Sequence, residues 1–307
     1  MKQLYYLLGG FIMLAATACE EPVDIQLDMP PAKLVVLSNF TADRDLRVSV
    51  TVSQSVATPG IGNFVDNATV RLYDDKTFIQ QLTLIEEHNE RYYSSRHFSP
   101  VPGVVYTIEV SAPGYATVTG ESSIPPGVTL YHLQLNELNV IRDTFSNQKQ
   151  YRYKIEIGFD DPVDQRNFYH LTLEQELKPF TVEQGDTVFA PAVRRPIRFD
   201  PRATNNLQIV HHDGSLLFED TPFNGESQLL RLPVTIEIND DQEYPGRLFA
   251  ELRSVTEEYY LFHTSLSRQQ NSANQPFADP VLLFNNIKNG HGVFAGYSSS
   301  QASVFVR

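Results

Sequence analysis

The densest group of potential metal ligands in the sequence is the triplet His211-His212-Asp213. Imidazole nitrogens and carboxylate oxygens are the ligand types that bind zinc and related ions. Adjacent side chains on a β-strand point to opposite faces, however, so the two histidines cannot easily bind one ion. We therefore interpret the triplet as an exposed strand end that turns through Asp213 and Gly214. The sequence predicts no metal site and no cofactor.

Two acidic runs could offer oxygen ligands to calcium, residues 160–164 (DDPVD) and 239–243 (NDDQE). The first lacks the spacing and the closing glutamate of an EF-hand loop, so we interpret it as a turn between two strands. The second is interpreted in the same way, as a solvated acidic loop.

Catalytic motifs are absent from the sequence: it has no G-x-S-x-G, no H-E-x-x-H, no phosphate loop and no dinucleotide fingerprint after a strand. Gly290-His291-Gly292 comes closest to a glycine-rich loop, but it leads into a predicted strand and not into a helix N-terminus. These glycines are expected to permit a tight turn or a close backbone approach. Paired carboxylates for glycoside hydrolysis are neighbours in space and not in sequence, so 37 acidic residues reveal no pair. No catalytic residue is predicted.

The N-terminus has the pattern of an export signal. Lys2 precedes the apolar run 4–16, which suits a secretory signal peptide and is shorter than a bilayer-spanning helix. We therefore predict a signal peptide over residues 1–18.

Cys19, the only cysteine in the chain, follows this signal directly. The sequence Ala16-Thr17-Ala18-Cys19 resembles the lipobox of bacterial lipoproteins, in which small residues precede a cysteine that is lipidated before cleavage. Ala16 stands where leucine is usual. We predict lipidation at Cys19, and the alternative is an ordinary signal peptide cleaved after Ala18. Two or more acyl chains would anchor the protein stably.

Residues 19–31 (CEEPVDIQLDMPP) are acidic and contain no base, so they are expected to form an acidic tether and not a folded element. Acidic residues just behind a lipidated cysteine resemble the signal that exports Bacteroidota lipoproteins to the outer face of the outer membrane. A solvated linker without a sorting role is the alternative. The expected location is the outer membrane, lipid-anchored and facing outside.

The net charge of the chain limits the kinds of molecule that it is expected to bind. The 24 Lys and Arg residues against 37 Asp and Glu residues give 24 − 37 = −13. A nucleic-acid partner would require a basic surface, so none is expected. One cysteine also excludes an internal disulfide framework.

Beyond the tether, apolar and polar residues alternate with the period of two that is typical of half-buried strands. In the first half the predicted strands are 33–40, 46–52, 68–73, 78–85, 91–98, 104–111 and 116–124. Seven short strands in under a hundred residues favour an immunoglobulin-like or transthyretin-like β-sandwich over residues 32–126.

Residues 127–307 are predicted to form a larger antiparallel β domain with one α-helix, so the fold class is all-β. The predicted strands are 151–159, 167–173, 228–238, 247–253, 281–285, 292–297 and 302–306, and the proline-rich stretch 189–201 suits edges and loops. Apolar residues at helical spacing predict a helix near 256–270, capped by Thr256. Adjacent aromatic pairs such as Phe168-Tyr169 are expected to place one ring in the core and the other outward.

Several short motifs occur in a familiar order along the chain. They are Lys33-Leu34-Val35-Val36, Gly114-Tyr115, Phe159-x-Asp161-Pro162 with Asn167-Phe168-Tyr169, Leu217-Phe218-x-Asp220-x-x-Phe223-Asn224-Gly225, Glu258-Tyr259-Tyr260 and Asn285-Asn286-Ile287-x-Asn289-Gly290-x-Gly292-Val293-Phe294. Together with the lipobox-like cysteine, the set resembles the Bacteroidota lipoprotein family of domain of unknown function 4249 over essentially the whole mature chain. His291 departs from the small apolar residue expected at its position. The resemblance implies an outer-membrane lipoprotein encoded beside a TonB-dependent transporter, without established catalytic residues.

Three functions are compatible with the sequence. The leading hypothesis is a lipid-anchored accessory protein that binds a TonB-dependent transporter or its cargo and is not an enzyme. The second is an extracellular polymer hydrolase that uses acidic residues of the second domain, which a cleft with perturbed carboxylates would favour. The third is a structural or adhesive β module, which an exposed apolar patch without a pocket would favour.

Overall fold

The computed structural model describes residues 31–54, 62–142, 148–163, 165–200, 208–211, 213–239, 241–272 and 281–306. The predicted signal peptide, Cys19 and all but the last residue of the tether lie outside the described residues. In chain order the elements are β1 (Leu34–Phe40), β2 (Arg47–Val52), β3 (Thr69–Asp74), β4 (Thr77–Gln81), β5 (Thr83–Glu87), β6 (Glu90–Ser94), β7 (Val105–Ser111), β8 (Val118–Ser123), β9 (Leu130–Arg142), β10 (Gln148–Asp160), β11 (Phe168–Glu183), β12 (Asp186–Phe189), β13 (Val193–Ile197), β14 (Gln208–Val210), β15 (Leu216–Glu219), β16 (Ser227–Asn239), β17 (Glu243–Val255), α2 (Glu257–Ser272) and β18 (His291–Phe305).

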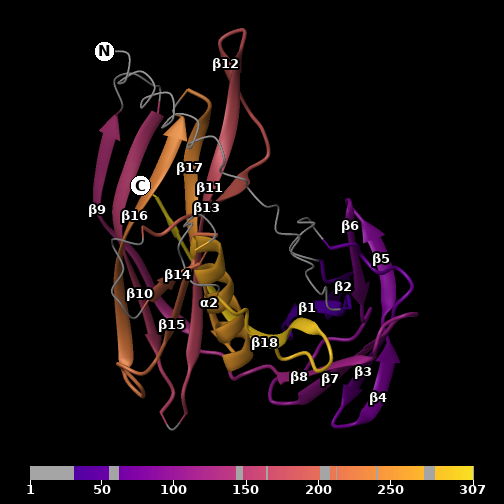
Figure 1. Cartoon of the computed structure of the whole chain (residues 1–307). Coiled ribbons are helices and arrows are strands. Elements are labelled where there is room, and N and C mark those ends of the chain that lie inside the picture. The colour runs from indigo at the N-terminus through magenta and orange to yellow at the C-terminus, as the bar shows by residue number, and fades with distance from the viewer. Residues whose placement is uncertain are drawn as a thin grey trace, which may run out of the picture. The chain divides into compact units, whose positions relative to one another are not determined.

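The first half of the chain forms a β-sandwich, as its alternation predicts. One layer contains strands in the order β1-β2-β6-β5, and the other has the order β4-β3-β7-β8 (Figure 1). The inward residues of both layers, such as Val36, Val48, Leu72 and Ile108, are almost fully buried in a common core. The sandwich exists because alternate residues of each strand are apolar and have only the opposite layer to pack against.

One predicted strand of this sandwich was wrong in extent. The segment predicted as a single strand over 78–85 forms β4 and β5, which belong to different layers. The chain crosses between the layers at Leu82, whose side chain is buried and whose backbone N–H donates to the carbonyl of Val70 (2.8 Å).

The second half forms another pair of packed sheets. The sheet order β14-β15-β11-β17-β18 lies over the three-stranded sheet β16-β10-β9, and side chains such as Tyr169, Leu171, Ile155 and Leu248 form their common core. The edge strand β13 contains Pro196 and pairs with β11 alone, in agreement with the prediction of edges and loops for this stretch. Residues 281–285 were predicted as a strand and are not one.

The last strand, β18, belongs to both sandwiches. Residues 291–296 pair in parallel with β1, and Tyr297–Phe305 pair antiparallel with β17. The two strands predicted over 292–297 and 302–306 are therefore a single strand. Gly292 permits the parallel pairing, since it has φ +115 and a side-chain carbon built there would lie 2.0 Å from the carbonyl oxygen of Val36. The close backbone approach expected of this glycine is confirmed.

The predicted helix is present as α2, and it covers the face of the second sheet that points away from the sandwich core. The backbone N–H of Tyr260 donates to the carbonyl of Thr256 at its first turn (3.0 Å), and Glu257 and Glu258 follow at the positive end of the helix dipole. Because α2 packs on β11 and β18, Phe168 and Tyr169 are both buried, on opposite faces of β11. The outward position expected for one ring of this pair is wrong.

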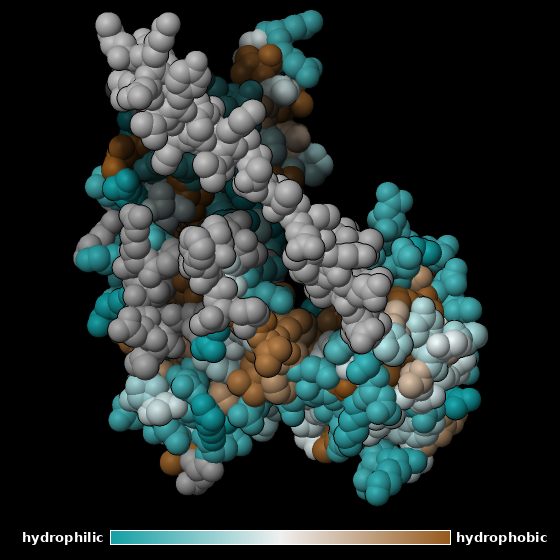
Figure 2. Space-filling view, in the orientation of Figure 1, coloured by the Kyte–Doolittle hydropathy of each residue, from teal (hydrophilic) through white to brown (hydrophobic). Residues whose placement is uncertain are grey.

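Exposed apolar side chains gather on the hairpin of β11 and β12, where Val182, Val188 and Phe189 are at least 47% exposed. Figure 2 shows brown residues among teal ones over this hairpin. Among the described residues, no helix is long and apolar enough to cross a membrane.

We predict that Gly292→Ala destabilises the protein more than Gly185→Ala does. Both glycines have positive φ, but a side-chain carbon at Gly185 would meet no atom within 4 Å. The φ strain alone costs roughly 1–2 kcal/mol in each variant. The clash with Val36 should add about 1–3 kcal/mol for Gly292→Ala only. Urea unfolding measures both free energies, and equal losses would contradict the shared-strand role of this contact.

Candidate functional site

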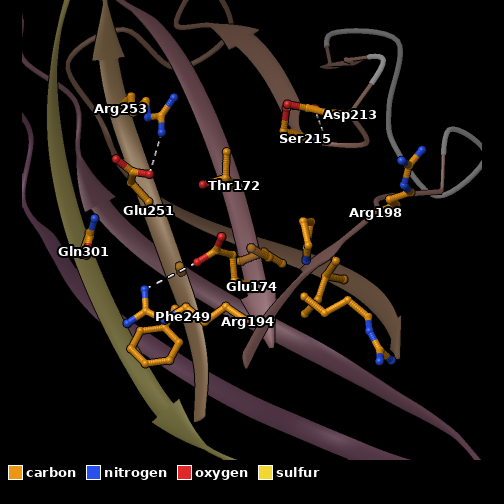
Figure 3. Close-up of a pocket in the computed structure, with 15 residues that line it drawn as sticks. Thr172, Glu174, Arg194, Arg198, Asp213, Ser215, Phe249, Glu251, Arg253 and Gln301 are labelled. Carbon is orange, nitrogen blue, oxygen red and sulfur yellow. Dashed lines mark hydrogen bonds and ion pairs between the residues drawn. The ribbon is translucent and has the colours of Figure 1, made fainter. Parts of the chain in front are cut away.

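A cleft of about 560 Å³ lies on the sheet face that α2 covers elsewhere (Figure 3). Along β11, alternate residues from Phe168 onward share this face, and their cross-strand partners on β17 follow the same order. The pairs are Phe168 with Val255, His170 with Arg253, Thr172 with Glu251 and Glu174 with Phe249. The helix packs over the first pair, and the last two pairs line the cleft. The cleft is therefore the uncovered continuation of the helix-binding face.

Seven of the fifteen residues that line the cleft are charged. They are Arg194, Arg195, Arg198 and Arg253, and the acidic residues Glu174, Glu251 and Asp213. Four cationic groups thus meet three anionic ones in a protein whose net charge is −13. The lining thus carries a small excess of positive charge on an acidic protein, although Arg195 also pairs with Glu243 outside the lining (3.1 Å).

Two of the arginines are held by partners within the cleft. Arg194 lies 3.5 Å from Glu174, and its guanidinium lies 3.7 Å from the centre of the Phe249 ring. Arg253 donates to Glu251 at 2.8 Å. Figure 3 shows both ion pairs on the strands at the floor of the cleft.

Arg198 is different. It is exposed and has no ion-pair or hydrogen-bond partner among the described residues. Its side chain lies close to Gly214, where an added side-chain carbon would come within 2.4 Å of the Arg198 Cγ atom. Its guanidinium is therefore available to a ligand.

The ion pair of Arg253 and Glu251 affects both pKa values. Burial alone would raise the pKa of Glu251, but the hydrogen bond and the charge of Arg253 outweigh burial, so the pKa is lowered. Burial alone would lower the pKa of Arg253, but the hydrogen bond that it donates to Glu251 raises this pKa. Glu251 is therefore ionised at neutral pH.

Asp213 and Ser215 occupy a tight turn between β14 and β15, as the sequence predicts. The Gly214 N–H donates to the carbonyl of His211 (2.8 Å), and the Ser215 N–H and hydroxyl both donate to Asp213 Oδ1 (2.9 and 2.5 Å). Burial alone would raise the pKa of Asp213, but the bonds from His211 and Ser215 lower it. The strand end is not exposed, however: His211 is 4% exposed, and its ring lies inside the protein. His212 lies outside the described residues.

His211 lies in the turn after β14 and belongs to a cluster of three imidazoles. His170 lies on β11, His263 lies on α2, and the ring centres are 5.1–6.2 Å apart. His170 Nδ1 is 2.8 Å from the Tyr259 hydroxyl, and His170 Nε2 is 2.5 Å from the Ser215 hydroxyl. His211 Nδ1 is 3.0 Å from Asp213 Oδ1. We call His170, His211, His263, Asp213, Ser215 and Tyr259 the histidine cluster.

Burial lowers the pKa of His170, and the charge of Arg253 lowers it further, so this ring is neutral. Burial raises the pKa of Tyr259 to about 12, against the opposing effect of Arg253. His170 and Tyr259 are thus a neutral imidazole and a neutral phenol in hydrogen-bond contact.

Sequence reasoning found His211 and Asp213 but missed His170, Tyr259 and His263. These three residues are far from the triplet 211–213 in sequence. Strand pairing and helix packing bring them next to it. The one available signal was His170 itself, a polar residue in a strongly apolar strand.

The motifs in the turns before β11 and after β15 have a structural role. Asp161 accepts hydrogen bonds from the Tyr169 hydroxyl and from the Gly225 N–H (2.8 Å for the latter). Asp220 Oδ2 accepts from the backbone N–H and the side-chain amide of Asn167 (2.7 and 3.1 Å). Burial raises the pKa of Asp161, against the bonds that it accepts. Both carboxylates close turns, in agreement with the prediction of a turn over 160–164.

The fold and the cleft together define an all-β protein with a locally basic site on one sheet face. The chain matches the family described as Domain of unknown function (DUF4249) over residues 20–303, and it belongs to this family. No curated protein matches the chain.

We predict that Asp220→Ala lowers the free energy of unfolding by about 1–3 kcal/mol, because it removes two hydrogen bonds to a buried carboxylate. Asp160→Ala is the matched control. Its exposed carboxylate accepts a bond from the Ser227 hydroxyl (2.6 Å), and its loss should change stability by at most about 0.5 kcal/mol. Urea unfolding of both variants measures the difference. Similar effects in the two would show that the Asp220 bonds are not structural.

Proposed function

We propose that the protein is a lipid-anchored accessory protein of the outer membrane that faces outside and binds an anionic cargo of a TonB-dependent transporter in the cleft. The observation that supports this proposal is the basic lining of the cleft in an acidic protein. Membership of the family and the lipobox-like Cys19 support the anchoring and the location.

The chemistry of the cleft favours an anion with planar acceptor groups. Guanidinium groups bind carboxylates and phosphates through two parallel hydrogen bonds. Arg198 can supply such a pair of donors directly. Arg194 is half-exposed and 3.5 Å from Glu174, so a ligand anion can take the place of this carboxylate. The size of the cleft falls in the range of about 300–1,000 Å³ that is typical of small-molecule sites.

The hydrolase alternative has less support. A glycosidase acid must be protonated near neutral pH, which requires a raised pKa. Glu251 has a lowered pKa, and Glu174 is paired with Arg194. Asp161 has a raised pKa, but it is buried and both of its oxygens accept hydrogen bonds outside the cleft.

The adhesive alternative would require an apolar surface to be the main exposed feature. The apolar side chains on the β12 hairpin form such a surface, but the protein also has the charged cleft. A binding site for a polar ligand accounts for the cleft, and an adhesive module does not.

We expect Arg198→Ala to weaken the binding of anionic ligands by at least about tenfold, because a charge-assisted hydrogen bond contributes about 1.5–3 kcal/mol. The probes are a panel of small organic and sugar acids, each paired with its uncharged amide, and the readouts are thermal shift and calorimetry. The control is Arg231→Ala, which removes a guanidinium that pairs with Glu156 on another sheet (2.8 Å). Equal binding of acids and amides, or an unchanged affinity in Arg198→Ala, would contradict the proposed ligand class.

Anchoring is tested at Cys19. We predict that Cys19→Ser abolishes labelling with fatty acid and releases the protein from the outer-membrane fraction, since two or more chains are required for stable attachment. Wild-type protein should be sensitive to protease on intact cells and should co-purify with a transporter from native membranes in mild detergent. A wild-type protein that carries an unmodified thiol would contradict the anchoring.

A further inference from the structure

The histidine cluster contains a set of ligand atoms of the kind that binds a transition metal. One atom each from His170, His211 and Asp213 lie within 4.8 Å of one another. The two imidazoles are 3% and 4% exposed, and the Asp213 side chain is half-exposed at the cleft. In a tetrahedral site with bonds of roughly 2.0–2.1 Å, the ligand atoms are about 3.3 Å apart. The ligand atoms would have to approach one another by up to about 1.5 Å to reach this geometry.

The ring nitrogens that face one another are the ones that could bind the ion. His211 Nδ1 is 3.0 Å from Asp213 Oδ1. His170 Nε2 reaches the same carboxylate oxygen through the Ser215 hydroxyl, in two steps of 2.5 Å. Both rings therefore present one nitrogen to the carboxylate of Asp213.

The opposite ring nitrogens are held by further polar groups. His170 Nδ1 is 2.8 Å from the Tyr259 hydroxyl, and His211 Nε2 is 3.1 Å from His263 Nδ1. Metal-ligating histidines have this arrangement, because a partner on the second nitrogen fixes the ring orientation and the tautomer. His263 is in turn held by Asn39, whose side-chain amide is 3.0 Å from His263 Nε2.

We propose that His170 Nε2, His211 Nδ1 and the Asp213 carboxylate bind one divalent transition-metal ion, with Zn²⁺ as the reference ion. Two imidazoles and one carboxylate are the donor set of zinc sites that keep an open coordination position. The same donor set also binds non-haem iron. Asp213 and Ser215 line the cleft, as Figure 3 shows, so the open position faces the cleft and can accept a donor atom from a bound molecule.

The nearby cation does not prevent this binding. Arg253 lies 3.4 Å from the Tyr259 hydroxyl, but its charge is compensated by Glu251 at 2.8 Å. Asp213 brings one negative charge to the ion directly. The proposal does not depend on whether the cleft binds an anionic cargo, since the ion is held by side chains of the protein alone.

The test uses the full chain with Cys19→Ser, which removes the only thiol, and without a histidine tag. Zn²⁺ is titrated by calorimetry, and Co²⁺ is titrated by visible absorption, which reports coordination number. We expect one ion per chain with an absorption typical of four or five ligands. His170→Gln and Asp213→Asn should each weaken the affinity by more than about 100-fold. Tyr259→Phe should weaken it by about 10–100-fold, because it removes the partner of a ligating ring.

The matched control is His132→Gln, which removes a part-exposed histidine that lies near a carboxylate, Glu156, at 3.8 Å. Its affinity should equal that of the parent chain. Circular dichroism and thermal unfolding establish that each variant is folded. If the His170→Gln variant does not fold, the Asp213→Asn variant decides the test. This substitution keeps the size of a part-exposed side chain, so the variant is expected to fold. A parent chain without stoichiometric binding, or an Asp213→Asn variant with the parent's cobalt spectrum and affinity, overturns the proposal.

Discussion

The parallel pairing of β18 with β1 is the contact on which the rest of the structure depends. Val36 and Gly292 come from opposite ends of the described chain, and their backbones meet without an intervening side chain. The same strand continues into the second sheet, where it pairs with β17 and supports α2. Both apolar cores and the helix contact therefore require one strand in one register. A shift by one residue would exchange the two faces of a strand. By fixing the register of β18, the glycine fixes which side chains of the sheet point to the core.

The position of the cleft follows from this sheet. Alternate residues of β11 and β17 point to the core or to the opposite face, and α2 is shorter than the strands that it covers. Beneath the helix this face is apolar, with Phe168 stacked on Tyr260. Beyond the helix the same face changes to Thr172, Glu174 and Glu251, since no element covers it there. His170 lies at the boundary between the two regions, and this position accounts for a polar side chain that is 3% exposed.

Much of the fold could be predicted from the sequence, because alternation and turn residues are local signals. The strands of the first sandwich and the helix near 256–270 follow from them. The division of residues 78–85 between two layers could not be predicted, since the apolar alternation continues through Leu82 and only the opposite sheet decides where the chain crosses. The site was harder to predict for the same reason. Two of its residues, His211 and Asp213, are close in sequence, whereas His170 and His263 reach the site by strand pairing and helix packing.

The polarity of the histidine cluster is not required by packing. Phe168, Tyr260 and Phe262 already attach α2 to the sheet through apolar contacts. Buried polar groups cost free energy unless every donor and acceptor is satisfied, and apolar side chains of similar size would often be at least as stable. The network combines residues of β11, α2, the turn between β14 and β15 and, through Asn39, β1. Support of a helix alone does not account for a network that costs this free energy of burial. Its most exposed member, Asp213, lies at the cleft, as the proposed metal site requires.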